Sequence, residues 1–488
     1  MKPQLLIGAP TSGSGKTMFT LGLLRALKKR GLKVQPYKGG PDYIDAQYLT
    51  IAADRDAVNL DTWMASSTHV QYVYNRYGEK ADVCVAEGMM GLYDGYYQMK
   101  GSCAEIAGLL NIPVVLVVNA RAAAYSVAPV LYGFKHFRSS VRIAGVVFSQ
   151  VSSPSHFACL KEACSDAGLE CLGYLPYSED LRVPSRHLGL TLTVRQSMDE
   201  LAEKAAALVE QYIDVDKLLN LCTRIFPCRY TLPYTSEQGV EAMETGRRKK
   251  MRIAVARDPA FNFIYRENLD RLAESGNLTF FSPVYGSDLP DADLVYLPGG
   301  YPELFARQLH RRKRMMQQLR DYAESGGKVF AECGGMMFLT RSLTARKGGT
   351  AYQMTGLLPV DCTMENARLH LGYRRMDYQG ISLRGHEFHY SSIAEPDTLP
   401  SVTPLYNVKG TEVSTPLYRY KNVIAGYTHW YWEKPICGNS GIKPIKAYAK
   451  SETTSCHAGR NRKRCGKKCP GSGPVPYFSA GRISSSSF

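Results

Sequence analysis

A cysteine at position 333 lies where a sharp turn would hold its thiol out of a sheet. The apolar residues 329–331 predict a buried strand, Glu332-Cys333-Gly334-Gly335 ends it, and residues 336–339 are typical of a helix. A thiol at such a turn, under the positive end of a helix, has a lowered pKa and can act as a nucleophile. For this stretch alone, a buried structural cysteine is the alternative interpretation.

Two later stretches favour the nucleophile. The sequence LPGGYPE at 297–303 is a second glycine-rich turn, and it follows a predicted strand at 293–297. The sequence GYTHW at 426–430 supplies His429, a late histidine that can act as a base. The three stretches together predict a cysteine–histidine active site.

A different chemistry is indicated near the N-terminus, where a buried strand at 5–7 runs into GAPTSGSGKT. The G-K-T ending is typical of a phosphate-binding loop for ATP, although a strict G-x4-G-K-T pattern would need glycine at Pro10. The Lys16 ammonium would neutralise phosphate charge and the Thr17 hydroxyl would face Mg²⁺. We expect the loop to bind ATP through Ser12, Gly13, Ser14, Gly15, Lys16 and Thr17.

Acidic residues follow two further predicted strands. Asp42 and Asp45 come after the strand at 33–37, and Glu87 and Asp94 come after the strand at 82–86. Doubly wound sheets bind ligands at the carboxyl ends of their strands, and an acid directly after a buried strand often completes the metal site of a phosphate-loop enzyme. Each acid alone could equally cap a helix or lie in a solvated turn.

These residues need a scaffold that places strand ends together. Further strands at 113–118 and 143–148 and a helix at 198–212 predict a doubly wound, mostly parallel α/β sheet. A second α/β domain, flavodoxin-like in pattern, opens with the strand at 252–256. We expect domains at 1–215 and 251–434, a linker at 216–250, and a basic tail at 435–488.

The composition excludes several classes of protein. The chain has 488 residues, is 44% hydrophobic and lacks the run of roughly 18–20 apolar residues that a membrane span needs. Its 13 cysteines are scattered and its start does not resemble a signal peptide, so we expect a cytoplasmic protein with reduced thiols. The net charge of +16 is concentrated after residue 430, so neither a nucleic acid nor a membrane is an expected partner. Assembly as a homodimer stays open.

The order of ten sequence blocks resembles the cobyrinate a,c-diamide synthase family. These enzymes join a dethiobiotin-synthetase-like ATPase domain to a class I glutamine amidotransferase-like domain. The resemblance covers residues 3–433 and lies in the blocks TSGSGKT, KGGPDYID, NLDTWM, EGMMGLYDG, VPSRHLGL, AFNFIYRENL, LPGGYPE, AECGGMM, GHEFHYS and YTHWYW.

The resemblance implies a carbon–nitrogen ligase that uses glutamine as nitrogen donor and acts on the a and c carboxylates of cobyrinic acid. ATP would convert each carboxylate to an acyl phosphate, with Thr17, Asp42 and Glu87 as Mg²⁺ ligands and with Asp45 and Asp94 at the corrinoid substrate. Cys333 would attack glutamine and His429 would activate the thiol. Backbone N–H groups at Gly300 and Gly334 would form the oxyanion hole.

Some residues depart from related patterns. Tyr431 stands two residues after His429, where class I amidotransferases usually carry glutamate, and His386 and His389 compete with His429 as the base. Ser149 and Gln150 stand where relatives carry an asparagine near adenine. Arg186 and His187 could contact an acidic ligand or anchor a loop. The basic tail matches no pattern, and Cys456, His457, Cys465 and Cys469 fit no strong zinc template. We expect the tail to be either disordered or a frameshifted reading of the last codons.

Several related functions remain open on the sequence alone. Hydrogenobyrinic acid or nickel-sirohydrochlorin could be the substrate, or the chain could be a cobyric acid synthase. A synthetase that uses free ammonia is a further alternative. In a different class, a partitioning-type ATPase would act as a switch without synthesis, although the domain that carries Cys333 argues against it.

Overall fold

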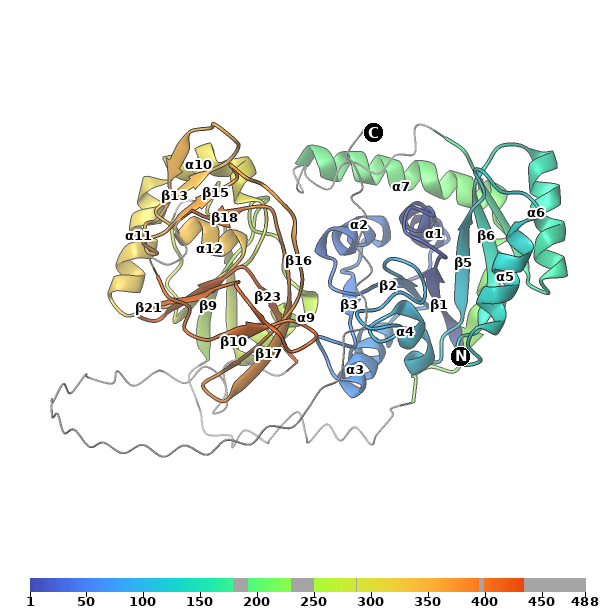
Figure 1. Ribbon diagram of the computed structural model, residues 1–488, viewed down its shortest axis with the longest axis horizontal. Helices are drawn as coiled ribbons and strands as arrows, with labels where there is room; N and C mark the ends of the chain where they lie inside the picture. The colour runs from blue at the N-terminus through green and yellow to red at the C-terminus, as the bar shows by residue number, and fades with distance from the viewer. Residues whose placement is uncertain (179–191, 230–249, 287, 395–398, 434–488) are drawn as a thin grey trace, which may run out of the picture. The chain divides into compact units, whose positions relative to one another are not determined.

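The first lobe is built on a parallel sheet of seven strands in the order β3-β2-β4-β1-β5-β6-β7, with β8 pairing antiparallel to β1 (Figure 1). It is seen in a computed structural model that describes residues 1–178, 192–229, 250–286, 288–394 and 399–433. The chain order reverses on either side of β1, which is the doubly wound arrangement that the sequence predicted. The strands are β1 (Lys2–Gly8), β2 (Val34–Gly39), β3 (Val58–Leu60), β4 (Val83–Glu87), β5 (Val114–Asn119), β6 (Ile143–Val151), β7 (Cys171–Pro176) and β8 (Thr223–Arg224).

Helices connect these strands because parallel neighbours need a crossover. Helix α1 packs against α2 and against the long helix α7, while α5 packs against α6. Ser66, Ser102 and Ser153 cap their helices by accepting backbone N–H groups. The helices are α1 (Lys16–Lys29), α2 (Tyr43–Ala53), α3 (Ser67–Gly78), α4 (Cys103–Leu110), α5 (Val127–His136), α6 (Pro154–Asp166), α7 (Leu192–Tyr212) and α8 (Val215–Cys222).

The second lobe contains a six-stranded sheet in the order β10-β9-β11-β12-β22-β21, which is parallel except for the last pair. Two mostly antiparallel sheets, β14-β13-β15-β18 and β20-β19-β16-β17-β23, extend it. The strands are β9 (Met251–Ala256), β10 (Gly276–Phe281), β11 (Leu294–Leu297), β12 (Lys328–Glu332), β13 (Ser342–Thr344), β14 (Ala351–Gln353), β15 (Asp361–Thr363), β16 (His370–Tyr378), β17 (Ile381–His389), β18 (Ser392–Ile393), β19 (Leu405–Tyr406), β20 (Glu412–Val413), β21 (Leu417–Tyr420), β22 (Val423–Gly426) and β23 (His429–Tyr431).

The helices of the second lobe are short. Helix α11 buries Met315, Met316 and Leu319, so its apolar stripe packs toward the lobe's core. The helices are α9 (Arg266–Ser275), the 3₁₀ helix η3 (Pro302–Phe305), α10 (Ala306–Arg311), α11 (Lys313–Glu324) and α12 (Gly334–Leu339).

The two lobes contact each other through polar and aromatic side chains within one compact unit, Met1–Pro444. The Tyr373 hydroxyl donates to Asp61 Oδ2 at 2.5 Å, and the Tyr373 ring stacks on Trp63 at 4.7 Å. Arg384 donates to the Trp63 carbonyl, and Glu433 accepts the Ser66 hydroxyl at 2.6 Å. Specific side-chain contacts therefore join the two lobes.

Two element boundaries differ from the sequence prediction. Residues 215–224, placed near the start of a linker, form α8 and β8, and β8 pairs with β1 in the first lobe. Residues 262–275 have a helix-like sequence pattern, but the helix begins only at Arg266, because Phe263 forms a bridge with Gly299 instead. The antiparallel sheets of the second lobe were not predicted at all.

Some predictions concern parts of the chain outside the described residues. These are the VPSRHLGL block with Arg186 and His187, most of the linker, and the tail after residue 433 with its cysteines. Among the described residues, none of the helices combines the length and the apolar character that crossing a membrane requires.

Candidate active site

The phosphate-binding loop connects β1 to α1. Gly13 and Gly15 have φ angles of +75° and +86°, a region that glycine enters without strain, and Gly15 occupies the N-cap of α1. The free N–H groups at a helix N-terminus form an anion site. Lys16 Nζ donates to the Met90 carbonyl at 2.6 Å, and burial lowers the pKa of Lys16. The predicted loop thus has the backbone geometry needed to hold phosphates.

A buried ion-pair cluster lies beside this loop. Thr17 Oγ1 donates to Glu87 Oε1 at 2.9 Å, which brings together two of the predicted metal ligands. Lys38 Nζ lies 2.7 Å from the same oxygen and 2.9 Å from Asp45 Oδ2. Burial alone would lower the pKa of Lys38, but the carboxylates of Asp45 and Glu87 outweigh it and raise that pKa. The sequence analysis did not identify Lys38, although it lies at the end of β2, the strand that Asp42 and Asp45 follow.

The two remaining predicted acids are each held by a turn. Asp42 Oδ1 caps α2 by accepting from the N–H groups of Ile44 and Asp45 at 2.9 and 3.0 Å, and Asp42 also lines the cavity described below. Asp94 is exposed, and its Oδ2 accepts from Gly91 N at 2.9 Å. Asp94 does not line that cavity, whereas the next two residues do. The structure therefore brings Asp42, but not Asp94, to the predicted site.

A cavity of about 860 Å³ opens over the phosphate-binding loop and is lined by both lobes. Ser149 and Gln150, expected near adenine, lie on its wall, and Ser149 Oγ donates to the Ser14 carbonyl at 2.8 Å. The first lobe contributes the loop and the acids. The second lobe contributes a mainly apolar wall: Phe263, Leu369, Leu371, Gly372, Tyr373, His386, Phe388 and Val408.

Cys333 occupies the turn between β12 and α12 with a φ of +44°, a strained conformation for a residue with a side chain. A Cβ on Gly334 would lie 2.9 Å from Gly300 N and 2.8 Å from Pro302 Cδ. Only glycine allows this approach, so the two predicted oxyanion-hole residues have their main chains in contact. The predicted strand–turn–helix at the cysteine is confirmed.

The predicted lowering of the Cys333 pKa is wrong for this structure. The side chain is buried, and burial raises its pKa, with a further rise from the Glu303 carboxylate. The six-residue helix α12 provides only a weak opposing dipole. Cys333 Sγ makes a weak contact with the Phe388 carbonyl at 3.9 Å. The thiol therefore needs a base that takes its proton during the reaction.

His429 is buried and its two ring nitrogens have no hydrogen-bond partner among the described residues. Burial, with a smaller effect of the neighbouring His386, lowers its pKa to about 3. The ring packs on Tyr43 at 4.6 Å and on Phe263 at 6.1 Å. His429 is thus a neutral imidazole, the form a general base must have, and no hydrogen bond joins it to Cys333 in the described chain.

The two competing histidines have different environments. His386 pairs with His429 across strands β17 and β23 and lines the cavity, and burial lowers its pKa to about 3. His389 is engaged by Glu387 Oε1 at 2.9 Å and by the Ser391 carbonyl at 2.8 Å, and its ring stacks on Tyr427. Both ring nitrogens of His389 are therefore hydrogen-bonded, whereas both of His429 and the Nδ1 of His386 have no hydrogen-bond partner among the described residues.

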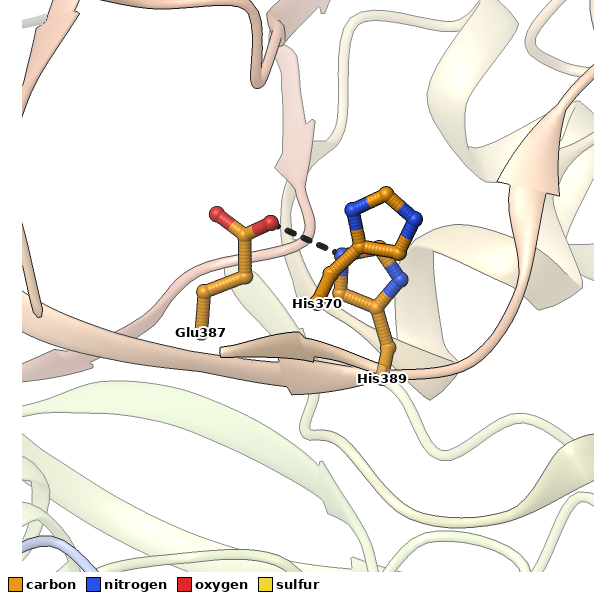
Figure 2. A group of neighbouring side chains, drawn as sticks. All are labelled: His370, Glu387 and His389. Atoms are coloured by element: carbon orange, nitrogen blue, oxygen red, sulfur yellow. Dashed lines mark hydrogen bonds and ion pairs between the residues drawn. The ribbon is translucent and has the colours of Figure 1, made fainter. Parts of the chain in front are cut away.

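Figure 2 shows His389 together with Glu387 and His370, a group whose ligand atoms all lie within 4.8 Å of one another. The two imidazole rings are parallel within 3°, so their in-plane lone pairs do not converge on one point. Glu387 Oε2 also accepts from Arg374 Nε at 2.7 Å. These contacts make the group an ion-pair network that joins β16 to β17.

Two family models match the chain. Residues 5–190 match the CobQ/CobB/MinD/ParA nucleotide binding domain, and residues 252–435 match the CobB/CobQ-like glutamine amidotransferase domain. The nucleotide-binding match implies use of ATP in the first lobe.

Curated relatives are similar over most of their length. A hydrogenobyrinate a,c-diamide synthase of Brucella abortus biovar 1 is 40% identical over 437 residues, which covers 87% of this chain and 97% of the relative. Cobyrinate a,c-diamide synthases of Dehalococcoides mccartyi and Saccharolobus solfataricus are 37% and 34% identical, covering 91% and 88% of this chain and 99% and 98% of the relatives.

Proposed function

Since this chain belongs to the cobyrinate and hydrogenobyrinate a,c-diamide synthase family, we propose that it amidates the a and c carboxylates of cobyrinic acid with ATP and glutamine. The reaction is a carbon–nitrogen ligation in cobalamin biosynthesis. The observation that carries the proposal is the cavity shared by the phosphate-binding loop and by β17, because the Phe388 carbonyl on β17 also contacts Cys333 Sγ. Phe388 thus lies between the cavity and the nucleophile, although Cys333 and His429 do not themselves line the cavity.

The first lobe activates the carboxylate. A carboxylate does not react with ammonia directly because oxide is a poor leaving group, and transfer of the ATP γ-phosphoryl group makes an acyl phosphate instead. Lys16 and the loop amides of Ser12, Gly13, Ser14 and Gly15 neutralise and orient the phosphates. Asp45, which lines the cavity and is held by Lys38, orients the acceptor, whereas Asp94 does not line the cavity and has no role in this proposal.

The residues present fit a Mg²⁺ ion beside the phosphates. Glu87 Oε2 is buried without a hydrogen-bond partner in the described chain, and Thr17 Oγ1 lies next to the same carboxylate. Hydroxyl and carboxylate oxygens are the ligands that Mg²⁺ prefers. Thr17, Asp42 and Glu87 would hold the ion, which when bound supplies positive charge to the transferring phosphoryl group.

The second lobe releases ammonia from glutamine. Cys333 Sγ attacks the side-chain amide carbon while its proton passes to His429, and the developing oxyanion lies against the N–H groups of Gly300 and Gly334. Ammonia leaves after taking that proton, and water hydrolyses the resulting thioester to glutamate. Ammonia then attacks the acyl phosphate and releases phosphate, which completes one amide.

The test is incubation with ATP, Mg²⁺, glutamine and cobyrinic acid, followed by mass spectrometry for two successive exchanges of hydroxyl for amino. Cys333→Ala should lose glutamine-dependent amidation and keep ammonia-dependent amidation. Hydrogenobyrinic acid is the second candidate acceptor, which the names of the relatives at 40% identity support, and a parallel incubation compares the two. ATP hydrolysis without amidation of any corrinoid would instead support a switch ATPase.

A further inference from the structure

Glu303 is an acidic residue of the GGYPE turn that the reaction steps above do not use. It lies in η3, three residues after Gly300, and its Oε2 is buried without a hydrogen-bond partner in the described chain. No ion pair involving Glu303 is found in that part of the molecule. A buried carboxylate without a partner is costly, so its retention calls for a cation that arrives from outside.

The pKa of Glu303 is consistent with a carboxylate that has no cation beside it. Burial raises its pKa to about 7, and the opposing effect comes from its own backbone N–H. No lysine, arginine or histidine contributes to that balance. An ammonium group that reached this carboxylate would restore its ionised form through a charge-assisted hydrogen bond.

Glu303 is next to the nucleophile. After burial, it is the strongest influence on the Cys333 thiol, ahead of Cys362 and Glu387. The preceding residue, Pro302, brings its Cδ within 2.8 Å of the Cβ position at Gly334. A molecule whose amide carbon lies at Cys333 Sγ would therefore have the rest of its short chain near this carboxylate.

Glu303 does not take the place of the acid that usually orients the catalytic histidine. The charged neighbours that affect His429 are His386, His389 and Glu387, and Glu303 is not among them. Glu303 thus influences the Cys333 thiol without affecting the candidate base.

We propose that Glu303 binds the α-ammonium group of glutamine and so selects glutamine over amides that lack this group. The inference rests on the proposed glutaminase reaction of the second lobe, and not on the identity of the corrinoid. It explains why an acidic side chain lies beside a thiol whose reaction it would otherwise hinder. Glu303 is accordingly a specificity residue that contacts the substrate away from the reacting bond.

The experiment compares glutamine with glutaramate, which carries the same amide and carboxylate but no α-ammonium group. Release of glutamate or glutarate is measured in the presence of ATP and the acceptor for the wild type and for Glu303→Gln. We expect Glu303→Gln to lower kcat/KM for glutamine by about 10- to 100-fold, the usual range for a hydrogen bond to a charged group, and to leave that for glutaramate within about twofold. Glu412→Gln, which changes an exposed glutamate of β20, is the matched control.

Other outcomes overturn the assignment. An equal loss with both amides would mean that Glu303 supports Cys333 itself, and unchanged selectivity would mean that it does not touch the substrate. If Glu303→Gln fails to fold, Glu303→Asp keeps the charge, and it should retain a preference for glutamine while raising its KM. Ammonia-dependent amidation should be unaffected in every variant. Glu303-dependent selectivity in a protein that amidates no corrinoid would leave this inference standing while the proposed acceptor fails.

Discussion

Tyr43 of the first lobe packs its ring on the imidazole of His429 in the second lobe, with 4.6 Å between the ring centroids. Tyr43 directly follows Asp42, the N-cap of α2, and both residues line the cavity over the phosphate-binding loop. The ring nitrogens of His429 have no hydrogen-bond partner in the described chain, so aromatic packing sets the position of its ring. The candidate base of one reaction is therefore held by a residue at the site of the other.

This contact leads to a prediction for Tyr43→Leu. Loss of the ring should let His429 leave its position and lower glutamine-dependent kcat by about 10- to 100-fold, within the range that a general base contributes. Tyr43→Phe, which keeps the ring, should retain most of that activity. The measurement is the ratio of glutamine-dependent to ammonia-dependent amidation, because Tyr43 also lines the acceptor cavity. An equal fall in both activities would show that Tyr43 serves the acceptor alone.

Gly334 provides a second prediction. A methyl group there would meet Gly300 N and Pro302 Cδ inside normal contact distance, so Gly334→Ala should separate the two main chains of the oxyanion hole. We expect glutamine-dependent kcat to fall by about 10²–10³-fold, as for loss of one oxyanion donor, while ammonia-dependent amidation continues. The control is Gly133→Ala in α5, where nothing lies within 4 Å of the added carbon and where activity should be unchanged.

The local structures that were predicted correctly are those set by neighbouring residues in the chain. The loop that ends in Lys16 and Thr17 and the turn at Cys333 each need only a strand, a glycine turn and a helix in sequence. The sheet of the first lobe followed from the same alternation of strands and helices. Local patterns were sufficient for these features.

The parts that were missed depend on residues far apart in the chain. The role of Lys38 follows from its contact with Glu87, and the role of Tyr43 follows from its contact with His429. His429 lies near the other end of the described chain, so the sequence around Tyr43 does not reveal this contact. The expected direction of the Cys333 pKa was wrong because burial by the surrounding lobe, rather than the adjacent helix, decides it. Glu303 stood in a recognised motif, but its unpartnered oxygen is a property of the folded lobe.

Lys38 is the subject of a third prediction. Its ammonium bridges two buried carboxylates, and Lys38→Met would leave Asp45 and Glu87 without it. Breaking a buried ion pair from one side costs about 3–5 kcal/mol, so we expect a loss of that order in the free energy of unfolding, measured in urea. Lys29→Met removes an exposed pair with Glu203 and should cost at most about 1 kcal/mol. Similar losses in the two variants would contradict the importance of the buried cluster.

Glu387 gives a prediction about pH. Burial would raise its pKa, but His389, Arg374 and Thr415 outweigh burial and lower that pKa to about 2 from an ordinary 4.5. Because the folded protein holds the ionised form, this group stabilises the fold above about pH 4.5, and its contribution is lost as the pH falls toward 2. The full contribution is about 3 kcal/mol, taken from the difference between the two pKa values.

Glu387→Gln should therefore lower the free energy of unfolding by about 3 kcal/mol at pH 7 and by progressively less between pH 4.5 and 2, where the wild-type carboxylate becomes protonated as well. Urea unfolding of both proteins at a series of pH values measures this difference. The contributions of titratable groups that both proteins share cancel when the two free energies of unfolding are subtracted. Glu412→Gln, at an exposed position of β20, should show no such trend. If the loss in the free energy of unfolding stayed constant down to the lowest pH, Glu387 would contribute through packing and not through its charge. The ion-pair network that joins β16 to β17 would then not account for the stability of this region.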